Sequence, residues 1–134
     1  MFGKGKKKPA DSPQLGTTME SIPSRLRELC GEDEEMYATL SRLMLIDPQK
    51  LFVRLEDVLT EAQDSEAKGS NIKAEVSYRI AGSISLWKGD VDGVRKYFTR
   101  ASGIIGDSRP EYRNIAKRAD VAVGIARKYY AALE

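Results

Sequence analysis

Few side chains in this sequence could carry out catalysis. The chain contains no histidine and a single cysteine, Cys30. Nucleophiles activated by histidine, histidine-containing metal sites, thiolate clusters and internal disulfides are therefore excluded. Cys30 follows Leu26 and Leu29 on the apolar face of an expected helix, where it is most simply a small buried side chain. Because a lone cysteine fits a reducing compartment, we expect a cytoplasmic protein.

Four consecutive acidic residues form the group that could bind a divalent cation: Glu32, Asp33, Glu34 and Glu35. They fall in the expected first turn of a helix, where the helix dipole stabilises negative charge without a ligand. Consecutive helical residues point around the axis and do not converge on one ion, so we predict no metal site. No pair of acids lies in an evident apolar pocket that would separate their pKa values. The sequence predicts no catalytic residue, no cofactor and no enzymatic activity.

Residues 1–17 are rich in glycine, lysine, proline and serine, which predicts a disordered tail. Its positive charge comes from Lys4, Lys6, Lys7 and Lys8. Removing these four from the 22 basic residues leaves 18 against 20 acids, so the remainder is not built as a nucleic-acid-binding surface. The tail could bind nucleic acid or an anionic membrane, where each lysine contributes about 1 kcal/mol. A solvated tail without a binding role is the simpler interpretation.

Apolar residues in the rest of the chain recur every three or four positions, which predicts helices. A length of 134 residues suits one domain. We therefore expect a single all-α domain over residues 18–134 with five or six antiparallel helices. A stack of helical hairpins and an ordinary helical bundle both fit this pattern. No apolar run approaches the roughly 20 residues that span a bilayer.

Proline marks two expected helix starts. The sequence at 21–23, Ser-Ile-Pro, predicts the start of the first helix. Asp47 before Pro48 predicts an N-cap for a helix that continues to about residue 67. We expect this helix to bury one apolar stripe, which consists of Leu51, Phe52, Leu55, Val58, Leu59 and Ala62.

The last helix is expected to be long. Ser108 and Glu111 have the spacing of a capping box, with Pro110 between them in the first turn. The apolar pattern then continues without a break signal, which predicts one helix from 111 to about 132.

The centre of the chain, residues 74–101, predicts two helices packed antiparallel across a tight turn. The first carries a stripe of small residues that permits a close neighbour, made of Ala74, Tyr78, Ala81, Gly82 and Ser85. Gly89 is expected in the left-handed conformation that ends this helix, and Asp90 is expected to cap the next. The returning helix presents its own apolar stripe, made of Val91, Val94, Phe98, Ala101 and Ile105.

These residues resemble a tetratricopeptide (TPR) repeat, a helical hairpin with a pattern of aromatic, small and apolar positions. The positions that match are Tyr78, Ala81, Gly82, Val94, Phe98 and Ala101. One repeat length of 34 residues beyond Tyr78 lies Tyr112, followed by Ile115, Ala116 and Ala119 at the same spacing. Ser85, Val94 and Gly106 depart from the family pattern. The resemblance covers about the second half of the chain and implies a TPR-like stack.

The family binds its ligands in a concave groove lined by the first helix of each pair. The resemblance places six residues of this chain in such a groove: Arg79, Ser83, Trp87, Arg113, Asn114 and Lys117. It implies basic and amide side chains that hold a peptide carboxylate, with Trp87 as an apolar anchor. Without the resemblance, these residues are ordinary exposed charges on two helices, with Trp87 in the core.

The sequence therefore predicts a non-enzymatic interaction module that binds a partner peptide or protein chain in a helical groove. The alternative is a protein whose basic tail binds nucleic acid or an anionic membrane, with the helical body as a scaffold. A second copy of the chain is a further partner that could cover the open face of a short repeat.

Overall fold

The structure, a computed structural model, describes residues 24–132. The predicted basic tail and the predicted helix start at 21–23 lie outside the described residues. Within 24–132 all regular structure is helical and no strand occurs, so the predicted all-α class is confirmed. None of the helices in this range combines the length and the apolar character that crossing a membrane requires.

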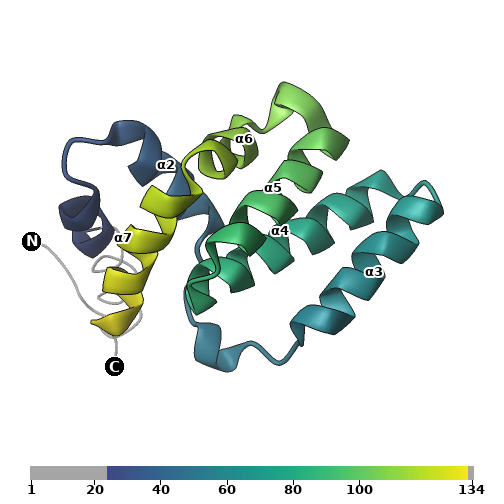
Figure 1. The fold of residues 1–134 in the computed structure, drawn as a ribbon, viewed down its shortest axis with the longest axis horizontal. Coiled ribbons are helices and arrows are strands. Elements are labelled where there is room, and N and C mark those ends of the chain that lie inside the picture. Colours follow the sequence, from purple (N-terminus) through teal and green to yellow (C-terminus); the bar gives the residue numbers. More distant parts are fainter. Residues whose placement is uncertain (1–23, 133–134) are drawn as a thin grey trace, which may run out of the picture.

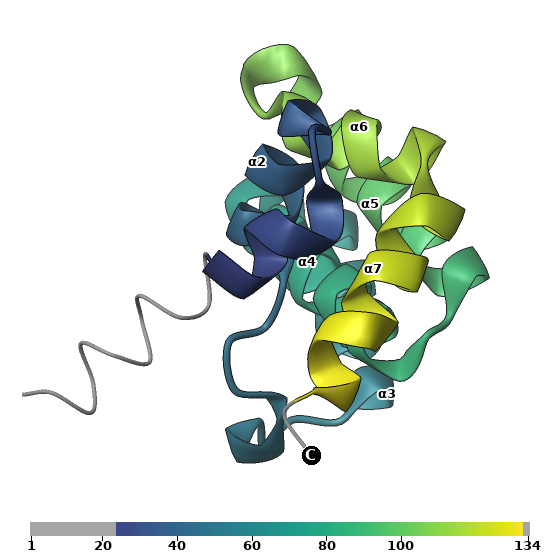
Figure 2. The same cartoon turned by 90° about the vertical axis from the view of Figure 1, so that its left-hand side faces the viewer.

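The helices form a row, and the helices from the two ends of the described chain lie together at one side of it (Figures 1 and 2). A helical segment at 24–30 comes first, and the later elements are α2 (Glu34–Leu43), η1 (Pro48–Lys50), α3 (Leu55–Ala67), α4 (Asn71–Lys88), α5 (Val91–Ile105), η2 (Gly106–Ser108), α6 (Pro110–Lys117) and α7 (Ala119–Ala131). In the row, α3 packs on α4, α4 on α5 and α5 on α6. Helix α2 packs on α6, and α7 packs on α4 and α5.

The predicted turn between α4 and α5 is confirmed. Gly89 follows the last turn of α4 with a φ angle of 77°, in the left-handed region. The Asp90 N–H donates to the Ser85 carbonyl at 2.9 Å, and the Asp90 carboxylate accepts from the Gly93 N–H at 3.0 Å. The turn thus satisfies backbone groups of both helices at once.

The small-residue stripe of α4 lets α5 approach closely. A Cβ atom added at Gly82 would lie 2.6 Å from the Phe98 ring, and one at Gly93 would lie 2.5 Å from the Ser85 Oγ. Gly82 contacts Phe98, whereas the later residue Ser85 contacts the earlier residue Gly93. The two helices therefore run in opposite directions.

The segment before α3 differs from its prediction. The Asp47 side chain makes no cap hydrogen bond, and the proline that follows opens only one 3-10 turn. Residues 51–54 have no helical structure, and α3 begins at Leu55. Phe52, which was expected in the buried stripe, is 92% exposed.

The reason lies in the elements that this segment connects. The Leu43 carbonyl accepts a hydrogen bond from Ser83 on α4, and the Leu45 carbonyl accepts one from Tyr130 on α7. From there the chain must reach the start of α3 on another face of α4. An extended residue advances about 3.3 Å and a helical one about 1.5 Å, so an extended segment spans this distance with fewer residues.

The prediction of one long last helix is wrong. The helix breaks at Arg118, which has φ −122° and ψ 40°, and this separates α6 from α7. The predicted capping box is also wrong, because Ser108 donates to the Ile105 carbonyl and Glu111 is buried. The break lets α6 pack on α2 and α5 while α7 packs on α4, so both helices bury their apolar faces.

Candidate functional site

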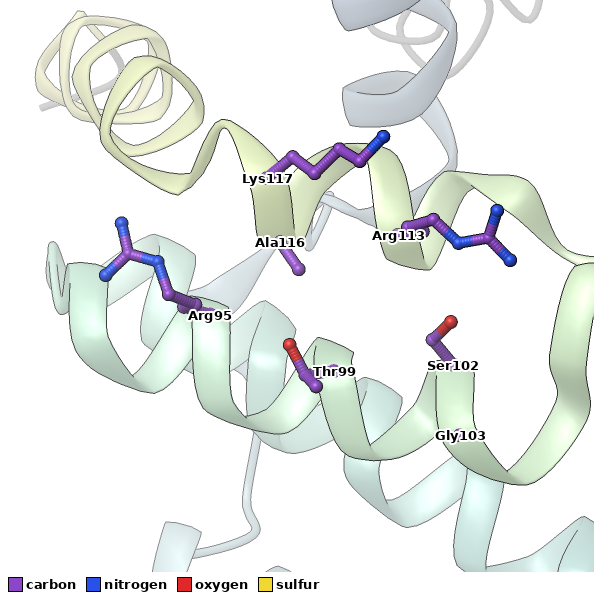
Figure 3. A pocket seen from close by; sticks show the side chains of 7 residues that line it. All are labelled: Arg95, Thr99, Ser102, Gly103, Arg113, Ala116 and Lys117. Atoms are coloured by element: carbon purple, nitrogen blue, oxygen red, sulfur yellow. The ribbon is translucent and has the colours of Figure 1, made fainter.

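A groove of about 590 Å³ lies between α5 and α6 (Figure 3). We call it the α5–α6 groove. It is lined by seven residues, four from α5 and three from α6: Arg95, Thr99, Ser102, Gly103, Arg113, Ala116 and Lys117. In Figure 3 the α5 side chains rise toward α6, and the methyl group of Ala116 points into the hollow.

The groove exists because two large buried residues hold α5 and α6 apart, while the residues above them are small. Phe98 and Tyr112 are fully buried, and their rings stack with centroids 5.9 Å apart. Above this pair, Gly103 and Ala116 leave space between the helices. A Cβ atom added at Gly103 would meet nothing within 4 Å. The aromatic pair therefore fixes the width of the groove, and the small residues leave it unfilled.

Three cations border the groove. Arg95 forms an ion pair with Asp92 at 3.7 Å, and Arg113 forms one with Asp107. Within residues 24–132, Lys117 forms no ion pair. The carboxylates of Asp92 and Asp107 are 98% and 80% exposed, and such exposed pairs contribute little to stability. An incoming anion can therefore compete for these guanidinium groups.

The groove presents positive charge and hydrogen-bond donors. Arginine offers a planar set of five N–H donors, lysine offers three donors, and the hydroxyls of Thr99 and Ser102 add further donors. Charge-assisted hydrogen bonds from such groups hold carboxylates in a defined orientation.

Two of the six groove residues predicted from the sequence lie in this groove, Arg113 and Lys117. They are one turn apart on α6 and therefore share a helix face. Arg79 and Asn114 are half-buried and are not among the residues that line it.

The structure corrects the predictions for Ser83 and Trp87. Ser83 is buried, and its Oγ donates to the Leu43 carbonyl at 2.5 Å, so α2 covers the position expected to face a ligand. Trp87 is half-buried and lines a different hollow of about 360 Å³, together with Leu51 and Leu55. It cannot serve as an anchor beside Arg113.

The sequence prediction missed the α5 side of the groove. Arg95, Thr99 and Ser102 recur at intervals of four and three residues, the spacing of one helix face. That polar stripe was the available signal. The sequence did not indicate that this face of α5, instead of a face of α4, would lie opposite α6.

The acidic run at 32–35 is used within the fold. The Asp33 carboxylate accepts from the guanidinium of Arg118 at 2.6 and 3.2 Å and from the Met36 N–H at 3.1 Å. The hydrogen bond from Arg118 is the main reason why the pKa of Asp33 lies below its ordinary value. Glu34 pairs with Arg27 in the same way. Within residues 24–132 no group of three or more metal-ligating side chains occurs.

A further polar cluster contains two buried side chains, Tyr112 and Glu75. The Tyr112 hydroxyl donates to the carboxylate of Glu75, which is 5% exposed, and Arg109 lies 3.4 Å from the same carboxylate. Burial, followed by the hydrogen bond to Glu75, raises the pKa of Tyr112 far above its ordinary value. The phenol therefore stays protonated near neutral pH, and its hydrogen bond to Glu75 joins α6 to α4.

No protein-family model matches this sequence, and neither a curated protein nor a solved structure does. The chemistry of the α5–α6 groove is therefore the basis from which we infer a function. The predicted tail residues lie outside the described residues: Lys4, Lys6, Lys7 and Lys8.

Proposed function

We propose that this protein is a non-enzymatic interaction module that binds an acidic segment of a partner protein in the α5–α6 groove. The observation that carries the proposal is that three cations from two helices, Arg95, Arg113 and Lys117, border one hollow of about 590 Å³. The hydroxyls of Thr99 and Ser102 supply neutral hydrogen-bond donors on its floor.

The spacing of the cations suits a peptide with separate carboxylates. Arg113 and Lys117 are four residues apart on one helix, a rise of about 6 Å, and Arg95 stands on the other helix. Side chains of glutamate or aspartate on a short segment can reach both rims. The guanidinium groups would then exchange their exposed pairs with Asp92 and Asp107 for the partner's carboxylates.

A protein partner is favoured over nucleic acid by the acids beside the groove. Asp92 and Asp107 are both strongly exposed next to the cations. They would repel the continuous charge of a phosphate backbone, whereas a peptide can place its carboxylates between them. Nucleic-acid or membrane binding through the tail remains the alternative, and it is one outcome of the experiment below.

We further propose that α4, α5 and α6 form a TPR-like unit, which the α4–α5 turn and the contact between Gly82 and Phe98 support. The proposed groove lies between the second helix of this hairpin and the next helix, not between successive first helices. We also propose a cytoplasmic location, which the single cysteine supports.

The experiment measures binding of a fluorescein-labelled oligoglutamate peptide by fluorescence anisotropy. The groove variant, Arg113→Gln with Lys117→Gln, is expected to bind at least about tenfold more weakly, because it loses two charge-assisted contacts. The matched control, Arg127→Gln with Lys128→Gln, removes the same charge from exposed positions of α7 and is expected to bind like the unchanged chain.

Equal weakening in both variants would overturn the groove proposal, because it would show attraction to net charge alone. A chain without residues 1–17 provides the second arm. If this truncation abolishes binding of a labelled DNA duplex or of anionic vesicles, while oligoglutamate binds no variant, the tail alternative replaces the proposal. Oligoglutamate binding that survives the truncation supports the groove.

A further inference from the structure

The opposite edge of the helix row is strongly acidic. Helix α3 contains five acidic residues and no lysine or arginine. Three of them lie on one outward helix face and are exposed: Asp57, Glu61 and Asp64. We call these three residues the acidic stripe. The face that α3 buries against α4 carries Val58, Ala62 and Ser65 instead.

The stripe has no ion-pair partner among the described residues. Within residues 24–132, Asp57, Glu61 and Asp64 form no ion pair, whereas Glu56 pairs with Arg54 and Glu66 pairs with Arg100. Like charges one helical turn apart repel each other and destabilise the helix. A cationic surface placed against α3 would remove this repulsion.

The α5–α6 groove is such a surface, but it belongs to another part of the molecule. Helix α4 stands between α3 and α5, and α6 packs on α5 beyond it (Figure 1). One copy therefore cannot place its own stripe in its own groove. Two copies can do so, and the contact is of the head-to-tail kind that joins different surfaces of identical chains.

We propose that the acidic stripe of one copy docks in the α5–α6 groove of a second copy. The inference rests on the proposed function, because it requires the groove to bind carboxylates. The stripe runs over eight residues, 57–64, with a rise of about 10 Å, and the groove offers two α6 cations about 6 Å apart with Arg95 across the hollow. Each copy then keeps one free groove and one free stripe, so the assembly grows as a chain.

Such an association has a definite physical signature. Exposed charge pairs are individually weak and are screened by salt, so assembly is expected at high protein concentration and low ionic strength. Sedimentation velocity of the full chain over a range of concentrations should show an average mass that rises with concentration and falls as salt is added.

Two variants that neutralise one partner surface each test the contact. The groove variant keeps its stripe, and the stripe variant, Asp57→Asn with Glu61→Gln, keeps its groove. Each is expected to sediment as a monomer when alone. An equimolar mixture is expected to form a 1:1 complex that does not grow, because only one productive contact exists between the two variants. A matched control, Glu28→Gln with Glu32→Gln, changes two exposed acids elsewhere and should assemble like the unchanged chain.

A stripe variant that assembles like the unchanged chain would overturn the inference, and so would an unchanged chain that stays monomeric at low salt. The proposed function is tested separately, by oligoglutamate binding to the stripe variant, whose groove is intact and unoccupied by a second copy. Oligoglutamate binding by a chain that never self-associates would sink the head-to-tail contact alone. Loss of oligoglutamate binding would remove the basis of both proposals.

Discussion

The α4–α5 hairpin and the segment from Met44 to Arg54 carry similar signals in the sequence but have different structures. Each contains an aspartate in an N-cap context followed by apolar residues at helical spacing. In the hairpin, Asp90 caps α5 through a hydrogen bond from a backbone N–H. In the segment, Asp47 caps nothing, and the chain runs extended to α3.

The two regions differ in where their packing partners lie. The hairpin buries Phe98 against α4, the helix directly before it in the sequence, so its local signals and its packing agree. The segment connects α2 and α3, which pack on different helices, and within residues 24–132 no element covers Phe52. A cap signal therefore determines structure where the helix that it starts can also bury its apolar face.

Phenylalanine truncation should give the largest contrast between the two regions. Phe98→Ala is expected to lower the free energy of unfolding by about 3–5 kcal/mol, because the ring is fully buried and its removal leaves a cavity. Phe52→Ala is expected to change it by less than about 0.5 kcal/mol, since the ring is 92% exposed. Urea unfolding followed by circular dichroism measures both values. Similar losses in the two variants would mean that Phe52 is covered in solution.

Adding one methyl group should sharpen the account of the hairpin. Gly82→Ala is expected to destabilise the protein by about 1–3 kcal/mol, because the new Cβ atom would collide with the buried Phe98 ring. Gly124→Ala on α7 is the control, because a Cβ atom there meets nothing within 4 Å. It is expected to stabilise the protein by up to about 1 kcal/mol through helix propensity. Thermal unfolding measures the stability of both variants. Stabilisation of both would contradict the close approach of α4 and α5.

Removal of the two aspartates compares a working cap with an inactive one. Asp90→Ala is expected to cost about 1 kcal/mol, because the N–H of Gly93 loses its acceptor. Asp47→Ala is expected to cost less than about 0.5 kcal/mol, since its ion pair within residues 24–132, with Lys50 at 3.7 Å, is exposed. Chemical denaturation measures the free energy of unfolding of both variants. Equal losses would contradict the difference between the two aspartates.

The smallest effect concerns the pH dependence of the contact between the hairpin and α3. Hydrogen bonds from Tyr78 and then Arg100 hold the pKa of Glu66 below its ordinary value of 4.5. A depressed carboxyl pKa gives stability that is fully present above pH values near 4.5 and is lost as pH falls through the folded-state pKa. Glu66→Gln should therefore unfold with a shallower decline in stability below that pH than the unchanged chain. An unaltered pH profile would show that this contact does not persist in solution.

The candidate site was only partly predictable from the sequence. Arg113 and Lys117 share a face of one helix, and helical spacing alone brings them together. Arg95 and Thr99 could not be assigned to the same site, because the face of α5 that meets α6 depends on how the two helices pack. Ser83 was misplaced for the same reason, since its hydrogen-bond partner lies 40 residues away in the sequence.

Features that arise within a few residues of the chain could be read from the amino-acid sequence. These include the all-α class, the left-handed Gly89 that ends α4 and the carboxylate cap of α5. Each depends on backbone hydrogen bonds and steric contacts between near neighbours, which a short stretch of sequence encodes completely.

Three features instead depend on packing between distant parts of the chain: the start of α3 at Leu55, the break at Arg118 and the pairing of α5 with α6 around a cationic groove. Arg118 is held by Asp33, which is 85 residues away in the sequence. Contacts between residues so far apart in the sequence depend on which apolar faces are buried together. The α6 and α7 faces are buried on different helices, and this burial outweighed the continuous helical pattern at 111–132. The physical reason is that a helix in a folded protein gains more stability from packing its apolar face than from intrinsic helix propensity.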